Sequence, residues 1–204
     1  MQRHKASHLH YDLRLEMGGT LKSWALKKGP SMNPRDRRLA IFTKDHPLLY
    51  RFYRGIVPGP IWRGNKITKL GWRMVEIWDK GFYIPSRLPK GEDADAYMQD
   101  CLTKGFMEIF FHGKKLRGMF IMIKTPLKDK QFYNADRSWL LIKQEDKYAI
   151  HRFYNSEKLT PKHSFINRAL KREIDRNKIQ SGRFGKKTKS LFKKERKSKS
   201  NHIV

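Results

Sequence analysis

Three side chains capable of chemistry fall on alternate positions of one short segment. His10, Asp12 and Arg14 are two residues apart, and side chains at that spacing point to the same side of a β-strand. His4 lies six residues before His10 and adds a second imidazole. Two imidazoles and a carboxylate can bind a divalent metal and leave coordination positions open for a substrate. The competing interpretation is a solvated strand face, on which the same residue types are ordinary.

A second polar group follows farther along the chain. Arg38 begins a strand-like run, His46 follows that run, and Tyr50 comes four residues after His46. If His46 opens a short helix, Tyr50 lies on the same face of it. An arginine that neutralises charge, a histidine that transfers a proton and a tyrosine that donates a hydrogen bond suit phosphoryl chemistry around a metal. A capped turn at His46 and a surface charge at Arg38 are the alternatives.

The charge of the chain predicts a polyanionic partner. Its 204 residues include 46 Lys and Arg against 19 Asp and Glu, a formal net charge of +27. With 12% aromatic residues, the composition favours a packed domain that binds nucleic acid over a basic lipid-binding peptide. Cys101 is the sole cysteine, so an intramolecular disulfide is excluded and an intracellular location is expected. The sequence shows neither a signal peptide nor a membrane span, and no membrane partner is expected.

The elements that position these residues are mainly strands. Apolar and polar residues alternate from Leu9 to Met17, and Gly18-Gly19 then predicts a tight hairpin to a strand at Leu21–Leu26. The spacing of the strand-like runs predicts an antiparallel β-barrel with flanking helices. The further runs are Leu39–Thr43, Arg73–Trp78, Phe106–His112, Arg117–Lys124 and Ser138–Lys143.

Two helices interrupt this pattern. The first is predicted at Glu92–Thr103, and the second begins with Thr160 as N-cap and Pro161 at the first helical position. From residue 181 the composition is Lys, Arg, Ser and Gly with little apolar surface, which predicts disorder. The expected organisation is therefore a β-barrel domain over residues 1–150, a helical extension over 151–180 and a disordered basic tail over 181–204.

Several segments resemble, in order, the 3′-phosphoesterase module of bacterial and archaeal DNA ligase D. They are HKASHLHYDLRLE from His4, LKSWALKKGPS from Leu21, RRLAIFTKDHPLLY from Arg37, MVEIWDKG from Met74, GKKLRGMF from Gly113 and SWLLIK from Ser138. The resemblance extends from about Gln2 to Lys143. It implies a β-barrel with flanking helices and a manganese-stimulated enzyme. That enzyme removes 3′ ribonucleosides and 3′ phosphates from primer ends of DNA or RNA and leaves a 3′ hydroxyl.

Carried over residue by residue, the resemblance implies a role for nine side chains. The metal ligands would be His4, His10 and Asp12. The catalytic residues around the scissile phosphate would be Arg14, Arg38, His46 and Tyr50, and the substrate-binding residues would be Gln2 and Lys28. The cofactor would be Mn²⁺ or another divalent metal. The partners would be primer-template 3′ ends, with an end-joining ligase, a polymerase and end-binding proteins in the same repair process.

Three departures from the family pattern carry expectations of their own. Lys44 stands two residues before His46, where the family has a glutamate. This departure predicts weaker removal of a terminal phosphate. Family members usually carry an upstream segment with functional Arg and Asp residues, whereas this chain starts three residues before His4. We therefore expect either weaker phosphomonoesterase activity or a true start that lies further upstream. A glycine-rich loop of the family is longer and more basic here, so substrate contacts near residues 58–72 are expected to differ.

Three rival functions remain open at this point. One is a catalytically weak or inactive nucleic-acid-binding module with the same barrel. Another is an iron-dependent oxygenase, because two histidines and one carboxylate also suit ferrous iron. The third is a structural protein of the ribosomal type, which only the charge and the tail support.

Overall fold

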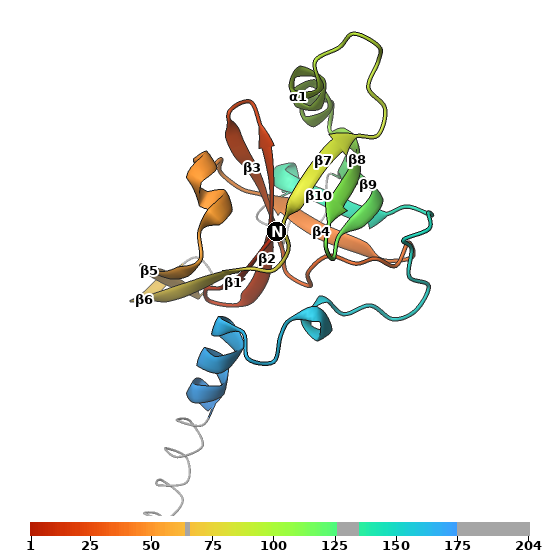
Figure 1. Cartoon of the computed structure of the whole chain (residues 1–204). Coiled ribbons are helices and arrows are strands. Elements are labelled where there is room, and N and C mark those ends of the chain that lie inside the picture. Colours follow the sequence, from red (N-terminus) through yellow and green to blue (C-terminus); the bar gives the residue numbers. More distant parts are fainter. Residues whose placement is uncertain (64–65, 126–134, 175–204) are drawn as a thin grey trace, which may run out of the picture. The chain divides into compact units, whose positions relative to one another are not determined.

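The computed structural model describes residues 1–63, 66–125 and 135–174 (Figure 1). The chain divides into two compact units, Met1–Pro161 and Lys162–Val204. The described part of the second unit includes a helix at residues 165–174. The predicted basic tail lies outside the described residues, and the predicted boundaries at residues 150 and 180 stay predictions.

Ten strands form one antiparallel sheet, so the predicted mainly-β architecture is confirmed. The strands are β1 Gln2–Lys5, β2 Leu9–Met17, β3 Thr20–Leu26, β4 Arg37–Phe42, β5 Gly55–Arg63, β6 Lys66–Ile77, β7 Gly81–Pro85, β8 Phe106–Gly113, β9 Arg117–Lys124 and β10 Ser138–Lys143. Their order in the sheet is β5-β6-β1-β2-β3-β4-β10-β9-β8-β7. The two ends of this order, β5 and β7, are not paired with each other, so barrel describes the fold only loosely.

The hairpin of β2 and β3 sets the register at the centre of the sheet. Gly18 and Gly19 have φ angles of 59° and 69°, values that suit the two positions of a tight turn matching the twist of the strands. This turn was predicted from the sequence and is confirmed. It sets Met17 opposite Thr20, and the register continues to Arg14 opposite Ser23.

The two faces of β2 have different environments. Alternate residues of β2, beginning with Tyr11 and Leu13, belong to the buried core and are at most 3% exposed. Trp24 of β3 and Ala40 of β4 belong to the same core. The intervening residues of β2 lie on the outer face of the sheet, because successive side chains of a strand point to opposite faces. Core packing therefore determines which side chains of β2 are available for a site.

Strands β1, β5 and β7 were not predicted from the sequence. Strand β1 lies between β2 and β6, although it is only four residues long. The segment expected to be a loop near residues 58–72 is instead part of a hairpin in which β5 pairs with β6. Figure 1 shows this hairpin extending from β1.

The described helices are short. Helix α1 at Ala94–Lys104 confirms the first predicted helix; Asp93 caps its N-terminus by accepting from the backbone N–H of Ala96, and Met98 is its buried residue. Figure 1 shows α1 beside the end of β7. The 3₁₀ helices are η1 Leu48–Phe52, η2 Ala135–Arg137 and η3 Ser156–Leu159. Helices α1, η1 and η2 lie between strands, whereas η3 follows the last strand. No helix in the described ranges is long and apolar enough to cross a membrane.

The predicted start of the second helix was wrong. Thr160 is the C-terminal cap of η3, and its side chain accepts a hydrogen bond from the Trp78 indole at 3.1 Å. The helix begins four residues after Pro161, at residue 165. The Ser164 hydroxyl accepts from the backbone N–H of Asn167 there, which is the contact an N-cap makes. Thr160 and Ser164 are both residue types that favour an N-cap. Thr160 ends η3 instead, and Ser164 caps the helix that follows.

A buried arginine joins η3 to the sheet. Arg3 is 1% exposed and donates hydrogen bonds to Glu157 at 3.0 and 2.6 Å and to Glu76 at 2.8 Å. The Tyr11 hydroxyl donates to the same Glu157 carboxylate. A buried charge is tolerable only when it is paired and hydrogen-bonded. Arg3 and Glu157 therefore depend on each other, although 154 residues separate them.

We expect Arg3→Met to lower the free energy of unfolding by about 3 kcal/mol, because the change leaves two carboxylates without their buried partner. The matched control is Arg87→Met, since Arg87 is 81% exposed and pairs with Glu108 at 3.4 Å. A surface pair of that kind contributes at most about 1 kcal/mol. Urea denaturation of both variants measures the difference. Equal stabilities would show that the Arg3 network does not hold η3 to the sheet.

Candidate metal centre and phosphate site

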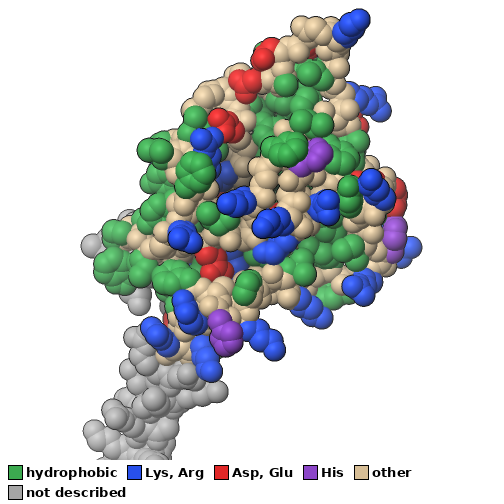
Figure 2. Space-filling view, in the orientation of Figure 1, with side chains coloured by type: hydrophobic (Ala, Val, Ile, Leu, Met, Phe, Trp, Pro, Cys, Tyr) green, Lys and Arg blue, Asp and Glu red, His purple; other side chains and the backbone are tan. Residues whose placement is uncertain are grey.

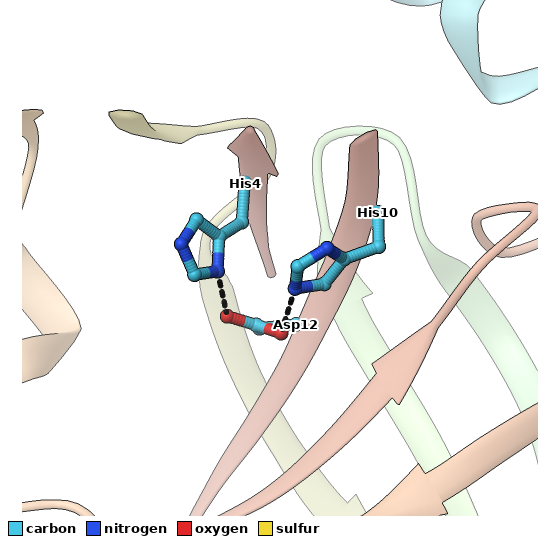
Figure 3. A group of neighbouring side chains, drawn as sticks. All are labelled: His4, His10 and Asp12. Carbon is cyan, nitrogen blue, oxygen red and sulfur yellow. Dashed lines mark ion pairs between the residues drawn. The ribbon is translucent and has the colours of Figure 1, made fainter. Parts of the chain in front are cut away.

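Two imidazoles and one carboxylate meet on the outer face of β1 and β2. His4 of β1 lies directly opposite His10 of β2, and the two ring centroids are 4.6 Å apart. His4 Nδ1 lies 3.3 Å from Asp12 Oδ2, and His10 Nε2 lies 3.4 Å from Asp12 Oδ1 (Figure 3). One potential ligand atom from each residue lies within 4.8 Å of the others. The predicted ligands are therefore brought together.

The donor set suits a divalent metal. Both ring nitrogens of His4 are buried; Nδ1 faces the Asp12 carboxylate, and Nε2 has no hydrogen-bond partner among the described residues. His10 Nδ1 lies 3.0 Å from the carbonyl oxygen of His8, so Nδ1 donates and the lone pair of Nε2 faces Asp12. A backbone carbonyl that orients a histidine in this way is typical of metal-binding imidazoles. Two nitrogens and an oxygen are a common ligand set for first-row metals.

The electrostatics of this group also favour a cation. Burial raises the pKa of Asp12, but hydrogen bonds and charge from His10 and His4 outweigh it and hold that pKa well below its usual range. Burial lowers the pKa of His10, but pairing with Asp12 outweighs it and raises that pKa. The carboxylate is thus ionised, and a proton on His10 competes with any metal for the same lone pair.

Arg14 continues the outer face of β2 from Asp12. Its side chain is 9% exposed, and one terminal nitrogen lies 3.2 Å from Asp12 Oδ2. The Nε and the other terminal nitrogen are buried and have no hydrogen-bond partner in the described part of the chain. Burial lowers the pKa of Arg14, yet a guanidinium stays charged. A buried cation with unpartnered N–H groups is suited to bind an anion.

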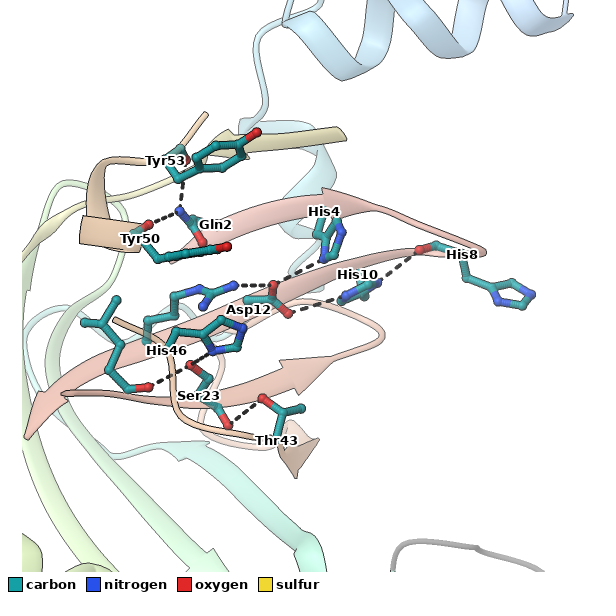
Figure 4. A network of polar contacts seen from close by, with 12 residues as sticks. Gln2, His4, His8, His10, Asp12, Ser23, Thr43, His46, Tyr50 and Tyr53 are labelled. Atoms are coloured by element: carbon teal, nitrogen blue, oxygen red, sulfur yellow. Dashed lines mark hydrogen bonds and ion pairs between the residues drawn. The ribbon is translucent and has the colours of Figure 1, made fainter. Parts of the chain in front are cut away.

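His46 faces the same site from the segment after β4. Its backbone pairs with Leu21 through hydrogen bonds of 2.8 and 3.1 Å, and its Nδ1 lies 3.1 Å from the Ser23 hydroxyl. That hydroxyl donates to the Leu21 carbonyl at 3.1 Å, so it accepts from Nδ1. This assignment leaves Nε2 of a neutral His46 free to accept a proton. Figure 4 shows His46 beside Asp12 and Tyr50.

The pKa of His46 is lowered from its ordinary value of 6.5. Burial is the largest cause, the positive charge of Arg14 is the next, and Lys44 adds to both, while Asp12 acts in the opposite direction. The imidazole is therefore mostly neutral at pH 7. A neutral imidazole that regains a proton at mildly acidic pH can act as an acid or as a base.

Gln2 supports Tyr50. Gln2 lies opposite Asp12, and its Nε2 donates to the carbonyl oxygens of Tyr50 at 2.7 Å and Tyr53 at 3.0 Å. These bonds hold η1, which places the Tyr50 ring 5.4 Å from the His46 ring and 5.8 Å from the Arg14 guanidinium. The helix begins after His46, but the expected proximity of His46 and Tyr50 is present. Gln2 thus positions a neighbour of the site, and its predicted contact with substrate stays a prediction.

The other two predicted residues do not join this group by any contact in the described residues. Arg38 donates to the Asp36 carboxylate at 2.8 Å and to the Tyr154 carbonyl at 3.3 Å. Ala25 pairs with both Asp12 and Ile41, so alternation along β4 places Arg38 on the opposite face from Asp12. Lys28 is exposed after the end of β3. Their catalytic and substrate-binding roles stay predictions.

Ser23 is a candidate functional residue that the sequence interpretation missed. The sequence did contain a signal for Ser23, because the predicted two-residue turn at Gly18-Gly19 already places Ser23 opposite Arg14. The contact with His46 was not visible in the sequence, since the two residues are 23 positions apart and meet through the bridge of His46 to Leu21.

Fold and site together define a mainly-β protein with a candidate metal centre beside a buried arginine that is suited to bind an anion. The family model of the DNA ligase D 3′-phosphoesterase domain matches residues 2–124. The chain belongs to this family of 3′-phosphoesterase domains.

Curated relatives agree with this assignment. The chain is 38% identical over 147 residues to a multifunctional non-homologous end joining protein LigD of Pseudomonas aeruginosa, which covers 72% of this chain and 15% of the relative. It is 33% identical over 130 residues to the protein of the same name from Mycolicibacterium smegmatis, covering 63% of this chain and 16% of the relative. The chain thus spans about one-sixth of the length of the relatives it matches.

We expect the affinity for Mn²⁺ to fall as the pH falls through the pKa of His10. That pKa is raised above 6.5, so the metal must displace a proton, and one such proton weakens apparent binding by about tenfold per pH unit. Titration calorimetry between about pH 5 and pH 8 measures the change. His10→Ala should abolish tight binding. His8→Ala is the control because the His8 ring points away from the group (Figure 4); equal loss in both variants would contradict the assignment.

Proposed function

We propose that the chain is a metal-dependent 3′-phosphoesterase that heals nucleic-acid 3′ ends. It removes a 3′ ribonucleoside or a 3′ phosphate and leaves a 3′ hydroxyl in end-joining repair. The observation that carries this proposal is the position of Arg14, whose unpartnered N–H groups lie next to the His4, His10 and Asp12 ligand set. Membership of the 3′-phosphoesterase domain family supports the same chemistry.

Each side chain has a defined task in this proposal. His4, His10 and Asp12 hold the metal, which is Mn²⁺ in the proposal and supplies a positive charge that polarises the phosphate when bound. Arg14 donates to non-bridging phosphate oxygens and neutralises the charge that develops there. These residues create a cationic pocket that favours the transition state over the free ester.

His46 acts on the proton. Its Nδ1 is held by Ser23, so Nε2 is the nitrogen that exchanges a proton with the substrate. In the protonated form it donates to the oxygen that leaves, and in the neutral form it accepts from the attacking water. The Tyr50 ring, 5.4 Å from that of His46, limits the orientations of the imidazole. Ser23 supports this geometry through His46, and Gln2 supports it through the backbone of Tyr50, in addition to its predicted contact with the substrate.

The proposal is tested with a primer-template that ends in a 3′ ribonucleotide or a 3′ phosphate, incubated with Mn²⁺ or with EDTA. We expect cleavage in the presence of Mn²⁺ and none in EDTA. His10→Ala and Asp12→Ala should abolish cleavage without unfolding the chain, because both changes remove metal ligands on the outer face rather than core contacts. His8→Ala should retain activity. Folded His10→Ala and Asp12→Ala variants that cleave normally would falsify the metal assignment. Metal-independent binding without cleavage by the natural chain would establish a binding module instead.

The second prediction of the proposal concerns Lys44. This residue is exposed and its charge lowers the pKa of His46, so it reduces the protonated fraction that donates to a leaving oxygen. Lys44→Glu should raise that pKa and move the alkaline limb of the rate profile, where the acid loses its proton, to higher pH. Removal of the terminal phosphate should increase more than removal of the ribonucleoside.

Lys44→Gln is the matched control, because it removes the positive charge without adding a negative one. Its effect should fall between those of lysine and glutamate. Single-turnover assays that resolve the two steps measure the response. Rates that do not change with the charge at position 44 would exclude this residue as the cause of weak phosphatase activity.

A further inference from the structure

An open groove leaves the phosphate site along the outer surface. Its lining includes Arg14 and Arg51, Phe82 and Tyr83 of β7, and the acidic residues Glu16 and Asp95. Its volume is about 390 Å³, which is in the range of small-ligand sites of about 300–1,000 Å³. A second hollow is lined by Arg14 and Phe82 as well. Phe82 is therefore the neighbour of Arg14 across this surface, although 68 positions separate them in the sequence.

Phe82 is part of an exposed aromatic pair. It lies directly opposite His112 in the register of β7 and β8, and the two rings are stacked with centroids 4.3 Å apart and an interplanar angle of 14°. Phe110 continues the row, with its ring 4.8 Å from that of His112. Phe82 is 64% exposed, so its ring is accessible to solvent while it stacks on His112.

Core packing does not explain these rings. Residues of β8 alternate between the core, where Ile109 and Phe111 are buried, and the outer face, where Phe110 and His112 lie. Exposed aromatic side chains that gather on one sheet face are typical of binding surfaces. Figure 2 shows a histidine surrounded by hydrophobic side chains over β7 and β8, with lysine and arginine side chains on the same face.

The charges around the row favour an anion. Arg117 lies opposite His112 across β8 and β9, and its guanidinium is 4.9 Å from the Tyr148 ring. Two acidic side chains line the groove. Glu16 is paired with Arg51 at 2.6 Å, and the Asp95 carboxylate accepts from the backbone N–H of Gly18 at 2.9 and 3.1 Å. Aromatic rings between cations are the combination that binds single-stranded nucleic acid, because bases stack on the rings while phosphates meet the charges. The net charge of +27 supports a polyanionic occupant over an apolar protein segment.

We propose that Phe82, stacked on His112, is the platform for an unpaired base next to the scissile phosphate. This inference rests on the proposed function, since it assigns the phosphate to Arg14 and the adjacent base to Phe82. Stacking requires a base that is free of its Watson–Crick partner. The site therefore selects 3′ ends whose terminal nucleotides are unpaired over fully paired blunt ends.

The test uses a short single-stranded oligonucleotide with a 3′ phosphate and 2-aminopurine as its terminal base, in EDTA so that it is not cleaved. Fluorescence anisotropy gives the affinity, and quenching of 2-aminopurine reports stacking. Phe82→Ala should weaken binding by about tenfold, the scale of one base stacked on an aromatic side chain, and should remove the quenching. Phe82→Leu keeps apolar area without a ring and should lose the quenching too, whereas Phe82→Trp should retain it.

Phe153→Ala is the matched control, because Phe153 is also exposed, at 81%, and does not line the groove. It should change neither affinity nor quenching. Because Phe82 is largely exposed, the variants should unfold at the temperature of the natural chain. A blunt duplex should bind more weakly than the single strand to the natural chain, and Phe82→Ala should remove this preference.

The outcomes separate the platform from the proposed function. Unchanged quenching in Phe82→Ala, or quenching retained in Phe82→Leu, would overturn the platform even if Mn²⁺-dependent cleavage is observed. Ring-dependent quenching in a chain that cleaves no 3′ end would support the platform and reject the catalytic proposal. A partner protein that binds this face and competes with no oligonucleotide would overturn the platform as well.

Discussion

The pairing of β1 with β2 is the constraint on which the candidate site depends. It places His4 opposite His10 and Gln2 opposite Asp12, so one short ladder supplies the metal ligands and the support of η1. Directly opposed residues of an antiparallel pair share a face and lie close together. A shift of one residue would turn His4 to the core side and bring Arg3 to the outer face. The Arg3 pairs with Glu76 and Glu157 oppose that shift, because they require Arg3 on the inner side.

Charge balance at Asp12 explains why the polar groups can be buried together. Two imidazoles and a guanidinium surround one carboxylate, so the group has more positive than negative partners when its histidines are protonated. In the proposed function, a divalent metal takes the place of the protons on the imidazoles, and a phosphate supplies negative charge beside the guanidinium. Nε2 of His4 and two nitrogens of Arg14 have no hydrogen-bond partner among the described residues. The proposed ligands would explain this, since buried donors and acceptors without partners are costly unless a ligand completes them.

Core packing and chemistry use opposite faces of the same strands. The buried residues of β2 and β8 fill the interior, which leaves the intervening residues of both strands outside. The open order of the sheet ends at β7, and the Tyr83 hydroxyl of that strand donates to the carbonyl of Glu16 on β2 at 2.5 Å. This hydrogen bond brings the edge strand β7 close to β2 at the centre of the sheet order. The outer surface is therefore continuous from Arg14 to Phe82.

Local sequence was sufficient for the features that depend on periodicity and turns. Alternation from Leu9 to Met17 placed His10, Asp12 and Arg14 on one face, and the two glycines that follow predicted the hairpin and with it the central register. His4 was a candidate ligand from its residue type and its distance of six residues from His10, and the resemblance to a known family supported it. Its strand was not predicted, because four residues are too few for periodicity to reveal. Glycine and proline in β5 hid that strand for a related reason, since both are typical of loops.

Long-range contacts decided the rest. Ser23 lies at the site because His46 bridges to Leu21. Arg38 lies on the opposite face of the sheet because Ala25 pairs with Ile41. Alternation along β3 cannot predict that register, since a loop separates β3 from β4. Thr160 became the cap of η3 rather than of the next helix because Trp78, 82 residues away, uses its hydroxyl. Periodicity is a property of neighbouring residues, and it assigns each side chain to a face. The choice of partner strand and the pairing of buried charges depend on the free energy of the whole packed sheet, which no local segment contains.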